Sequence, residues 1–242
     1  MRYRLELSYS GKDFHGWQRQ PNAETVQQTI EDAFLIIYKD KFEIVGCGRT
    51  DTGVHARNYT AHFNSENLYD ELTVNKLNSY LTDSIAIRSI TKVNDSFHAR
   101  FDAKSRTYEY YITTEKNPFL TEYAWYIPQK LDIDLMNEAA KVLLEFKDFT
   151  SFSKLHTDVK TNNFDIHEVG FIMEDNVITF KITADRFLRN IVRAIVGTLI
   201  LIGKNKINKQ DFIEIINAKD RGRAGQSAPA QGLSLININY YL

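Results

Sequence analysis

The most informative stretch of this 242-residue chain reads Gly46-Cys47-Gly48-Arg49-Thr50-Asp51-Thr52-Gly53-Val54-His55-Ala56. Three glycines within eight residues predict a backbone in conformations that other residues rarely adopt, and such a loop exposes the side chains that it carries. The stretch lies between two expected strands, one at 42–47 and one that carries Tyr59, Ala61 and Phe63 on one face. We therefore take this loop as the candidate site and the first guide to the fold.

Outward from the loop, strand and helix patterns alternate along the chain. Period-two alternation indicates strands at 3–9, 85–93, 106–114, 165–173, 177–184 and 233–240. Helical spacing predicts helices at 26–37, 72–80, 133–144, 187–202 and 211–217, with Thr25 and Gln28 as a capping box and Gly203 as a C-cap. The order predicts an α+β fold of two similar units, residues 1–105 and 106–242, with mixed or antiparallel sheets, outer helices and a central cleft.

Composition narrows the class of protein. Cys47 is the only cysteine, so no intramolecular disulfide can form and a reducing compartment is expected. The N-terminus lacks the apolar run of a signal peptide, and the most apolar stretch, 194–203, is shorter than the about 20 residues that a bilayer requires. These features predict a cytoplasmic protein without a membrane partner.

Charge is balanced overall but uneven along the chain. The net charge is −1, yet residues 181–223 contain ten Lys or Arg against four Asp or Glu, an excess of six. Such a segment fits either a groove for phosphates or an ordinary solvated surface, and charge alone does not decide between them.

The loop itself does not match common ligand sites. No Gly-Lys-Ser/Thr follows it, as a phosphate-binding P-loop requires. Asp51 and His55 would make a metal pair only with a third ligand at a recognisable spacing, and the sequence offers none, so no metal site is predicted. Taken alone, Asp51 fits a residue that caps its own turn.

Five blocks change this interpretation, because together they resemble the tRNA pseudouridine synthase A family. The loop resembles the family signature Gly-Arg-Thr-Asp-x-Gly-Val-His-Ala. The other four blocks follow in the family's order over nearly the whole chain: 14–20 with 25–27, 97–101 with Arg106, Tyr108 and Tyr110, 189–197, and 224–233. The resemblance implies the pseudouridine synthase fold, with the Asp loop in the first unit and the Tyr and Arg blocks in the second.

The implied reaction explains why a carboxylate is needed. Uridine loses its N1–C1′ bond, the uracil rotates, and the ring rejoins the sugar through C5. Charge develops at C1′ as in glycoside hydrolysis, where a carboxylate attacks or stabilises the centre. The resemblance assigns this carboxylate to Asp51. Direct attack on C1′ and removal of a ribose proton both stay open. No external group or electron is transferred, so no cofactor is expected.

The resemblance also assigns four further site residues. Tyr108 would stack on the flipped uridine, although tyrosines in strands are often core residues. Arg193, on an apolar stripe, would keep Asp51 ionised, although it also fits an arginine reaching from a core helix to solvent. Arg49 would help to extrude and position the nucleotide, or simply contact phosphate, and Leu233 would line the cleft.

Several positions depart from the family pattern: Ser10, Tyr59, Thr82, Phe164, Ser234 and residues 145–147. None is Asp51, Tyr108 or Arg193, so the expected reaction stands, whereas the departures weaken the expectation of which uridines are chosen. The implied partner is the anticodon stem-loop of tRNA, bound by a homodimer. Two alternatives remain: a non-catalytic RNA-binding module, which would not need the Asp–Tyr–Arg set, and a nucleoside or sugar hydrolase, which would need a second acid or a metal.

Overall fold

The computed structural model describes residues 1–153 and 161–241. The chain divides into two compact units, Met1–Lys104 with Leu235–Leu242 (unit 1) and Ser105–Ser234 (unit 2). The sequence-based division lay between residues 105 and 106, whereas these units divide after Lys104 and the C-terminal residues belong with unit 1. No helix among the described residues is both long enough and apolar enough to cross a bilayer.

The sheet of unit 1 is antiparallel around a central strand. In β1 (Arg2–Tyr9), every second side chain is buried, from Tyr3 to Tyr9. β1 pairs with β3 (His55–Asn64) on one side and β4 (Ile85–Val93) on the other, so that Leu5 faces Ala61 and Ile90. The short β2 (Val45–Gly46) pairs with β3, and β9 (Leu233–Asn239) is the other neighbour of β3. Because β2 has two residues, the strand predicted at 42–47 is mostly extended loop.

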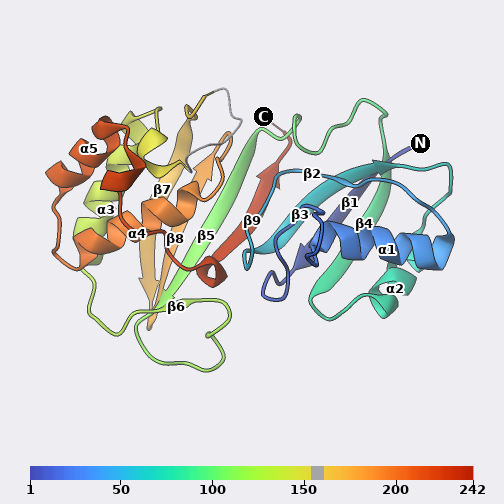
Figure 1. The fold of residues 1–242 in the computed structure, drawn as a ribbon, viewed down its shortest axis with the longest axis horizontal. Coiled ribbons are helices and arrows are strands. Elements are labelled where there is room, and N and C mark those ends of the chain that lie inside the picture. Colours follow the sequence, from blue (N-terminus) through green and yellow to red (C-terminus); the bar gives the residue numbers. More distant parts are fainter. Residues whose placement is uncertain (154–160, 242) are drawn as a thin grey trace. The chain divides into compact units, whose positions relative to one another are not determined.

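Two helices cover the buried face of this sheet (Figure 1). α1 (Val26–Tyr38) begins at Thr25, whose hydroxyl accepts a hydrogen bond from the Gln28 backbone. Phe34 of α1 packs on Phe63 of β3, with ring centroids 5.3 Å apart. α2 (Glu71–Tyr80) begins at Asp70, which forms a full capping box with Thr73. The helices therefore cover the core formed by the alternating side chains of β1 and β3.

Within unit 2, three strands pair antiparallel in the order β5–β8–β7. Its strands are β5 (Ser105–Thr113), β8 (Val177–Ala184) and β7 (Ile166–Glu174), and the short β6 (Trp125–Tyr126) pairs parallel to β5. Tyr110 of β5 lies opposite Phe180 of β8, which lies opposite Phe171 of β7. All three rings are buried and form one layer of the unit 2 core.

Three helices pack together in unit 2 (Figure 1): α3 (Ile133–Val142), α4 (Ile191–Gly203) and α5 (Lys209–Ala218). The described part of this unit also contains four 3-10 helices: η1 (Leu143–Glu145), η2 (Thr150–Phe152), η3 (Arg221–Arg223) and η4 (Ala230–Gly232). α4 is apolar on most sides and nearly all of its residues are buried, as expected for the central helix of a core.

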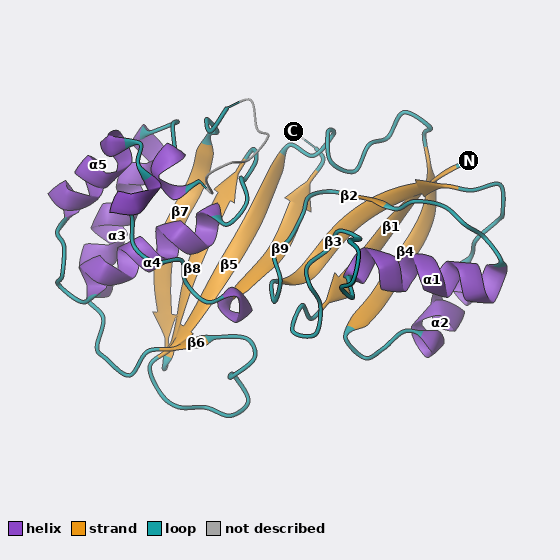
Figure 2. Cartoon of the chain, viewed as in Figure 1, coloured by secondary structure: helices purple, strands orange, loops and turns teal. Residues whose placement is uncertain are grey.

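The start of α4 differs from the prediction more than any other helix boundary, and Gly203 has another role than the predicted one. α4 begins at Ile191 instead of Phe187 because Asn190 adopts a left-handed conformation, with φ of 66°, which a helix cannot include. Gly203 is the last residue of α4 and is not its C-cap, which is Lys204. A Cβ at Gly203 would lie 2.4 Å from Met136 Sδ, so the glycine leaves room for the Met136 side chain of α3 to pack on α4. The predicted α+β class is confirmed, with helices beside antiparallel strands in each unit (Figure 2).

Candidate functional site

The loop that carries Arg49 and Asp51 connects β2 to β3 in unit 1. It leaves the sheet after Cys47, whose N–H donates to Thr60 O at 2.9 Å. It returns through a tight turn in which Val54 N–H donates to Asp51 O at 3.1 Å and Gly53 adopts φ of 79°. Asp51 is half-buried and Arg49 is exposed. The turn thus begins at Asp51 and requires glycine at position 53.

The N-terminal segment that follows β1 holds the loop by its backbone. Trp17 N–H donates to Thr50 O at 3.4 Å, and Gly53 N–H donates to Phe14 O at 3.3 Å. Gly16 has φ of 88°, and a Cβ there would lie 2.4 Å from Thr50 O. Only glycine permits this approach, which explains why the Gly-Trp-Gln segment and the Asp51 loop occur together in one sequence.

Three aromatic side chains, Tyr9, Trp17 and Tyr59, lie beneath the loop and are called the support cluster below. Trp17 stacks on Tyr59 with centroids 4.1 Å apart, and Tyr9 contacts both rings. The Tyr9 hydroxyl is hydrogen-bonded to Thr50 Oγ1 at 2.9 Å, and the Tyr59 hydroxyl donates to Gly48 O. Tyr59, a departure from the family pattern, is therefore a buried anchor of the loop.

Glycine at position 46 is a consequence of this packing. A Cβ at Gly46 would lie 2.2 Å from the Tyr59 hydroxyl oxygen and 2.6 Å from Trp17 Nε1. In contrast, a Cβ at Gly48 would meet nothing within 4 Å. The two glycines at the start of the loop thus differ. The support cluster leaves no room for a side chain at Gly46, whereas a side chain at Gly48 would meet no steric obstacle.

His55 is occupied by a structural contact. Its side chain is buried, and its Nδ1 accepts a hydrogen bond from Gly11 N–H at 3.1 Å, with Ser10 Oγ at 3.4 Å. This interaction ties the end of β1 to the start of β3. Among residues 1–153 and 161–241, no three His, Cys, Asp or Glu side chains gather as metal ligands would.

The block at 97–101 also folds into unit 1. Ala99 N–H donates to Nδ1 of the buried His62 at 3.1 Å, and the rings of His62 and His98 lie 4.7 Å apart. Burial, with a smaller effect from His98, lowers the pKa of His62 to about 4. His62 is therefore neutral near pH 7 and accepts the hydrogen bond that holds this block against β3.

The other three predicted site residues belong to unit 2. Tyr108 lies on β5, half-buried, opposite Ile182 of β8. Its ring meets Phe187 edge-on, with centroids 5.1 Å apart at 88°, and Phe187 in turn contacts Phe164. This T-shaped contact fixes the plane of the Tyr108 ring. Phe164, another departure from the family pattern, thus supports the neighbour of Tyr108.

Arg193 lies in the first turn of α4, half-buried, and fastens the loop 224–229. Its Nε donates to Ala228 O at 2.7 Å, and Ala228 N–H donates to Arg193 O at 2.9 Å. A Cβ at Gly197 would lie 1.8 Å from Gln226 O, so the loop crosses α4 directly over this glycine. The Val-Arg and Ile-Val-Gly parts of the block at 189–197 therefore serve one contact between helix and loop.

Leu233 follows the same loop in the sequence, and the segment before it packs on Tyr110. The hydroxyl of the buried Tyr110 donates to Pro229 O at 2.8 Å, and a Cβ at Gly232 would lie 2.5 Å from the Tyr110 ring. Burial raises the pKa of Tyr110 well above its usual value, against the opposing effect of the Arg193 charge. Leu233 then begins β9 as a buried residue. Tyr110 is thus a structural residue that keeps its proton.

The structure brings the predicted residues together in two groups. Arg49 and Asp51 share one loop of unit 1. In unit 2, Tyr110 supports the segment 228–233, which Arg193 contacts at Ala228 and which ends at Leu233. Sequence reasoning missed Tyr9, Thr50 and Tyr110 as supports of these loops. Their signals were weak, because each resembles an ordinary strand or loop residue until its long-range partner is known.

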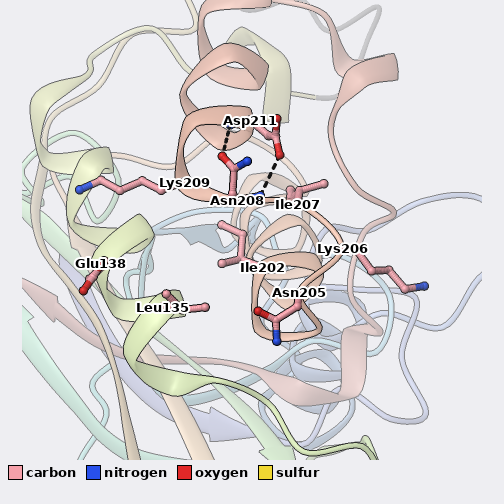
Figure 3. Close-up of a pocket in the computed structure, with 9 residues that line it drawn as sticks. All are labelled: Leu135, Glu138, Ile202, Asn205, Lys206, Ile207, Asn208, Lys209 and Asp211. Atoms are coloured by element: carbon pink, nitrogen blue, oxygen red, sulfur yellow. Dashed lines mark hydrogen bonds between the residues drawn. The ribbon is translucent and has the colours of Figure 1, made fainter.

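A groove elsewhere in unit 2 contains none of these residues. It lies between α3 and the α4–α5 connection and has an empty volume of about 580 Å³, part of it open to solvent. Figure 3 shows Leu135 and Glu138 on one side and residues 205–209 on the other, with Asn208 and Asp211 engaged in the cap of α5.

Comparisons with known proteins agree with the blocks described above. A family model described as tRNA pseudouridine synthase matches residues 7–102 and 139–241. The tRNA pseudouridine synthase A of Parabacteroides distasonis is 51% identical over 241 residues, which cover 99% of this chain and 96% of the relative. Those of Porphyromonas gingivalis and Clostridium acetobutylicum are 48% and 39% identical, over 99% and 98% of this chain and 97% and 98% of the relatives. The chain therefore belongs to the tRNA pseudouridine synthase family.

Proposed function

We propose that the chain converts uridine to pseudouridine in the anticodon stem-loop of tRNA, with Asp51 as the carboxylate that acts on the sugar. Family membership makes it an isomerase that acts on tRNA. The observation that carries the proposed role of Asp51 is the construction of its loop. The residues around it are fixed by backbone and aromatic contacts, while Asp51 itself stands at the corner of a tight turn.

This geometry suits a group that must act at one carbon atom. Carboxylates that act at an anomeric centre are effective only when they are held close to it, because correct placement lowers the entropic part of the barrier. In the reaction, the N1–C1′ bond breaks, a C5–C1′ bond forms, the hydrogen at C5 leaves as a proton, and N1 takes up a proton. No electron or external group moves, so the proposed reaction uses no cofactor.

The roles of the remaining residues follow from the family resemblance and the geometry within each unit. Tyr108, with its ring plane fixed by Phe187, stacks on the extruded uracil. By the family resemblance, Arg193 is the positively charged partner of the Asp51 carboxylate. The exposed Arg49 assists extrusion of the nucleotide, and Leu233 contacts the uracil region. A homodimer working on cytoplasmic tRNA completes the proposal, and light scattering with and without tRNA tests the dimer.

Asp51→Asn is the decisive variant. It preserves shape and removes the charge, so we expect single-turnover release of tritium from C5-labelled uridine in tRNA to fall at least about 10³-fold. Filter binding of tRNA and the melting temperature should stay near those of the parent protein. Sequencing for pseudouridine in tRNA from cells that lack the protein, with and without each form restored, identifies the uridines. Parent-like turnover by Asp51→Asn would refute the proposed role.

A further inference from the structure

Thr50, the residue before Asp51, is held by three contacts. Thr50 O accepts a hydrogen bond from Trp17 N–H at 3.4 Å, the Gly16 backbone lies directly against the same carbonyl, and Thr50 Oγ1 is hydrogen-bonded to the Tyr9 hydroxyl at 2.9 Å. We propose that Tyr9 is a positioning residue for the reaction, acting through the hydroxyl of Thr50 to place Asp51. The inference rests on the proposed function, in which the Asp51 carboxylate acts at C1′.

The contact is suited to positioning because it joins two rigid partners. Tyr9 is the last residue of β1 and only 4% exposed, with its ring held by Trp17 and Tyr59. Successive Cα atoms are linked at a fixed spacing of about 3.8 Å, so a shift of Thr50 moves Asp51 with it. Tyr9 belongs to the core sheet and Thr50 to the loop. The hydrogen bond therefore transfers the rigidity of the sheet to the residue beside the carboxylate.

The loop contains a second anchor of the same kind. The Tyr59 hydroxyl donates to Gly48 O, two residues before Thr50. Two buried tyrosines thus fix the positions on either side of the exposed Arg49, and the Val54–Asp51 turn closes the loop after Thr50. Structural and proposed catalytic roles therefore alternate along the loop. The two tyrosines hold Gly48 and Thr50, and the side chains at positions 49 and 51 act on the substrate.

Three variants and one matched control test the proposal. Tyr9→Phe keeps the packed ring and removes the hydroxyl, Thr50→Val removes the partner hydroxyl, and Thr50→Ser retains it. Tyr3→Phe is the control, because Tyr3 lies on the same strand, is 2% exposed and donates its hydroxyl to Asn67 O at 2.9 Å, away from the Asp51 loop. Tyr3→Phe thus reproduces the loss of a buried tyrosine hydroxyl without touching the site.

We expect Tyr9→Phe and Thr50→Val each to lower the single-turnover rate about tenfold, because small displacements of a reacting group cost one to two orders of magnitude. The affinity for tRNA should not change. The double variant should be no slower than either single variant, since both remove the same hydrogen bond. Thr50→Ser should retain the parent rate, and Tyr3→Phe should change the melting temperature as much as Tyr9→Phe but not the rate.

The outcomes separate this inference from the proposed function. Equal rates for Tyr9→Phe and Tyr3→Phe, or losses that multiply in the double variant, overturn the positioning role. Weaker tRNA binding at an unchanged rate also overturns it, because Tyr9 would then serve binding. Asp51→Asn is measured alongside. If Asp51→Asn remains active, the proposed function fails whatever Tyr9 shows, whereas an inactive Asp51→Asn with a normal Tyr9→Phe removes only the positioning role.

Discussion

The Asp51 loop of unit 1 and the loop 224–229 of unit 2 are fastened by different kinds of group. In unit 1, the anchors are neighbours of the proposed catalytic residue: Thr50 is bonded by Tyr9 and Gly48 by Tyr59. In unit 2, the proposed site residue Arg193 itself holds the loop, because its Nε donates a hydrogen bond to Ala228 O. Variants at Asp51 should therefore change the reaction rate alone, and variants at Arg193 should change both the reaction rate and the stability of the fold.

The largest combined effect on rate and stability is expected at Arg193. Arg193→Ala should lower the single-turnover rate about 10³-fold and also destabilise the fold by about 2 kcal/mol, because a buried carbonyl loses a charged donor. Arg193→Lys keeps the charge but not the planar donor group, so it should recover part of the rate and little of the stability. Tritium release and urea unfolding measure the two effects. A melting temperature for Arg193→Ala equal to that of the parent would remove the contrast between the two loops.

Two glycines sharpen the comparison on stability alone. Gly197→Ala brings a Cβ to 1.8 Å from Gln226 O on a buried helix, so we expect a loss of about 3 kcal/mol. Gly48→Ala meets no atom within 4 Å and should change the free energy of unfolding by less than about 0.5 kcal/mol. Urea denaturation of both variants compares them directly. A mild Gly197→Ala would mean that the loop moves freely away from α4.

The smallest effect concerns the basic segment, residues 181–223. Arg221 is half-buried and donates to Gly225 O at 3.1 Å and Ser227 Oγ at 2.9 Å, so its reversal to Glu disturbs the loop itself. Arg223 is exposed. Arg223→Glu should weaken tRNA binding severalfold and reduce the salt slope by about one, with an unchanged melting temperature.

The control for this measurement is Lys130→Glu, an exposed reversal outside the basic segment. Filter binding at several salt concentrations compares the two variants. If Arg223→Glu and Lys130→Glu give the same salt slope, the excess charge of residues 181–223 belongs to a solvated surface, and the phosphates are bound elsewhere.

Much of the fold was accessible from the sequence because it depends on local patterns. β4 and β8 have the limits that alternation predicted, and α2 differs by one residue from its predicted start. Family membership was readable from five blocks that keep their order along the chain. The errors arose where one residue overrides a pattern: the left-handed Asn190 delays α4, and the contact with Met136 explains Gly203 better than capping does.

By itself, the sequence determined the α+β class, the loop that carries Asp51 and the family. The identity of the anchors was decided by tertiary structure. Tyr9 and Thr50 are 41 residues apart, and Arg193 and Ala228 are 35 apart, so neither pair follows from helical or strand periodicity. Tyr59 looked like a simple departure from the family until its hydroxyl was found on Gly48 O. Periodicity records which face of an element is buried, but only the folded chain establishes which distant group each buried hydroxyl or guanidinium meets.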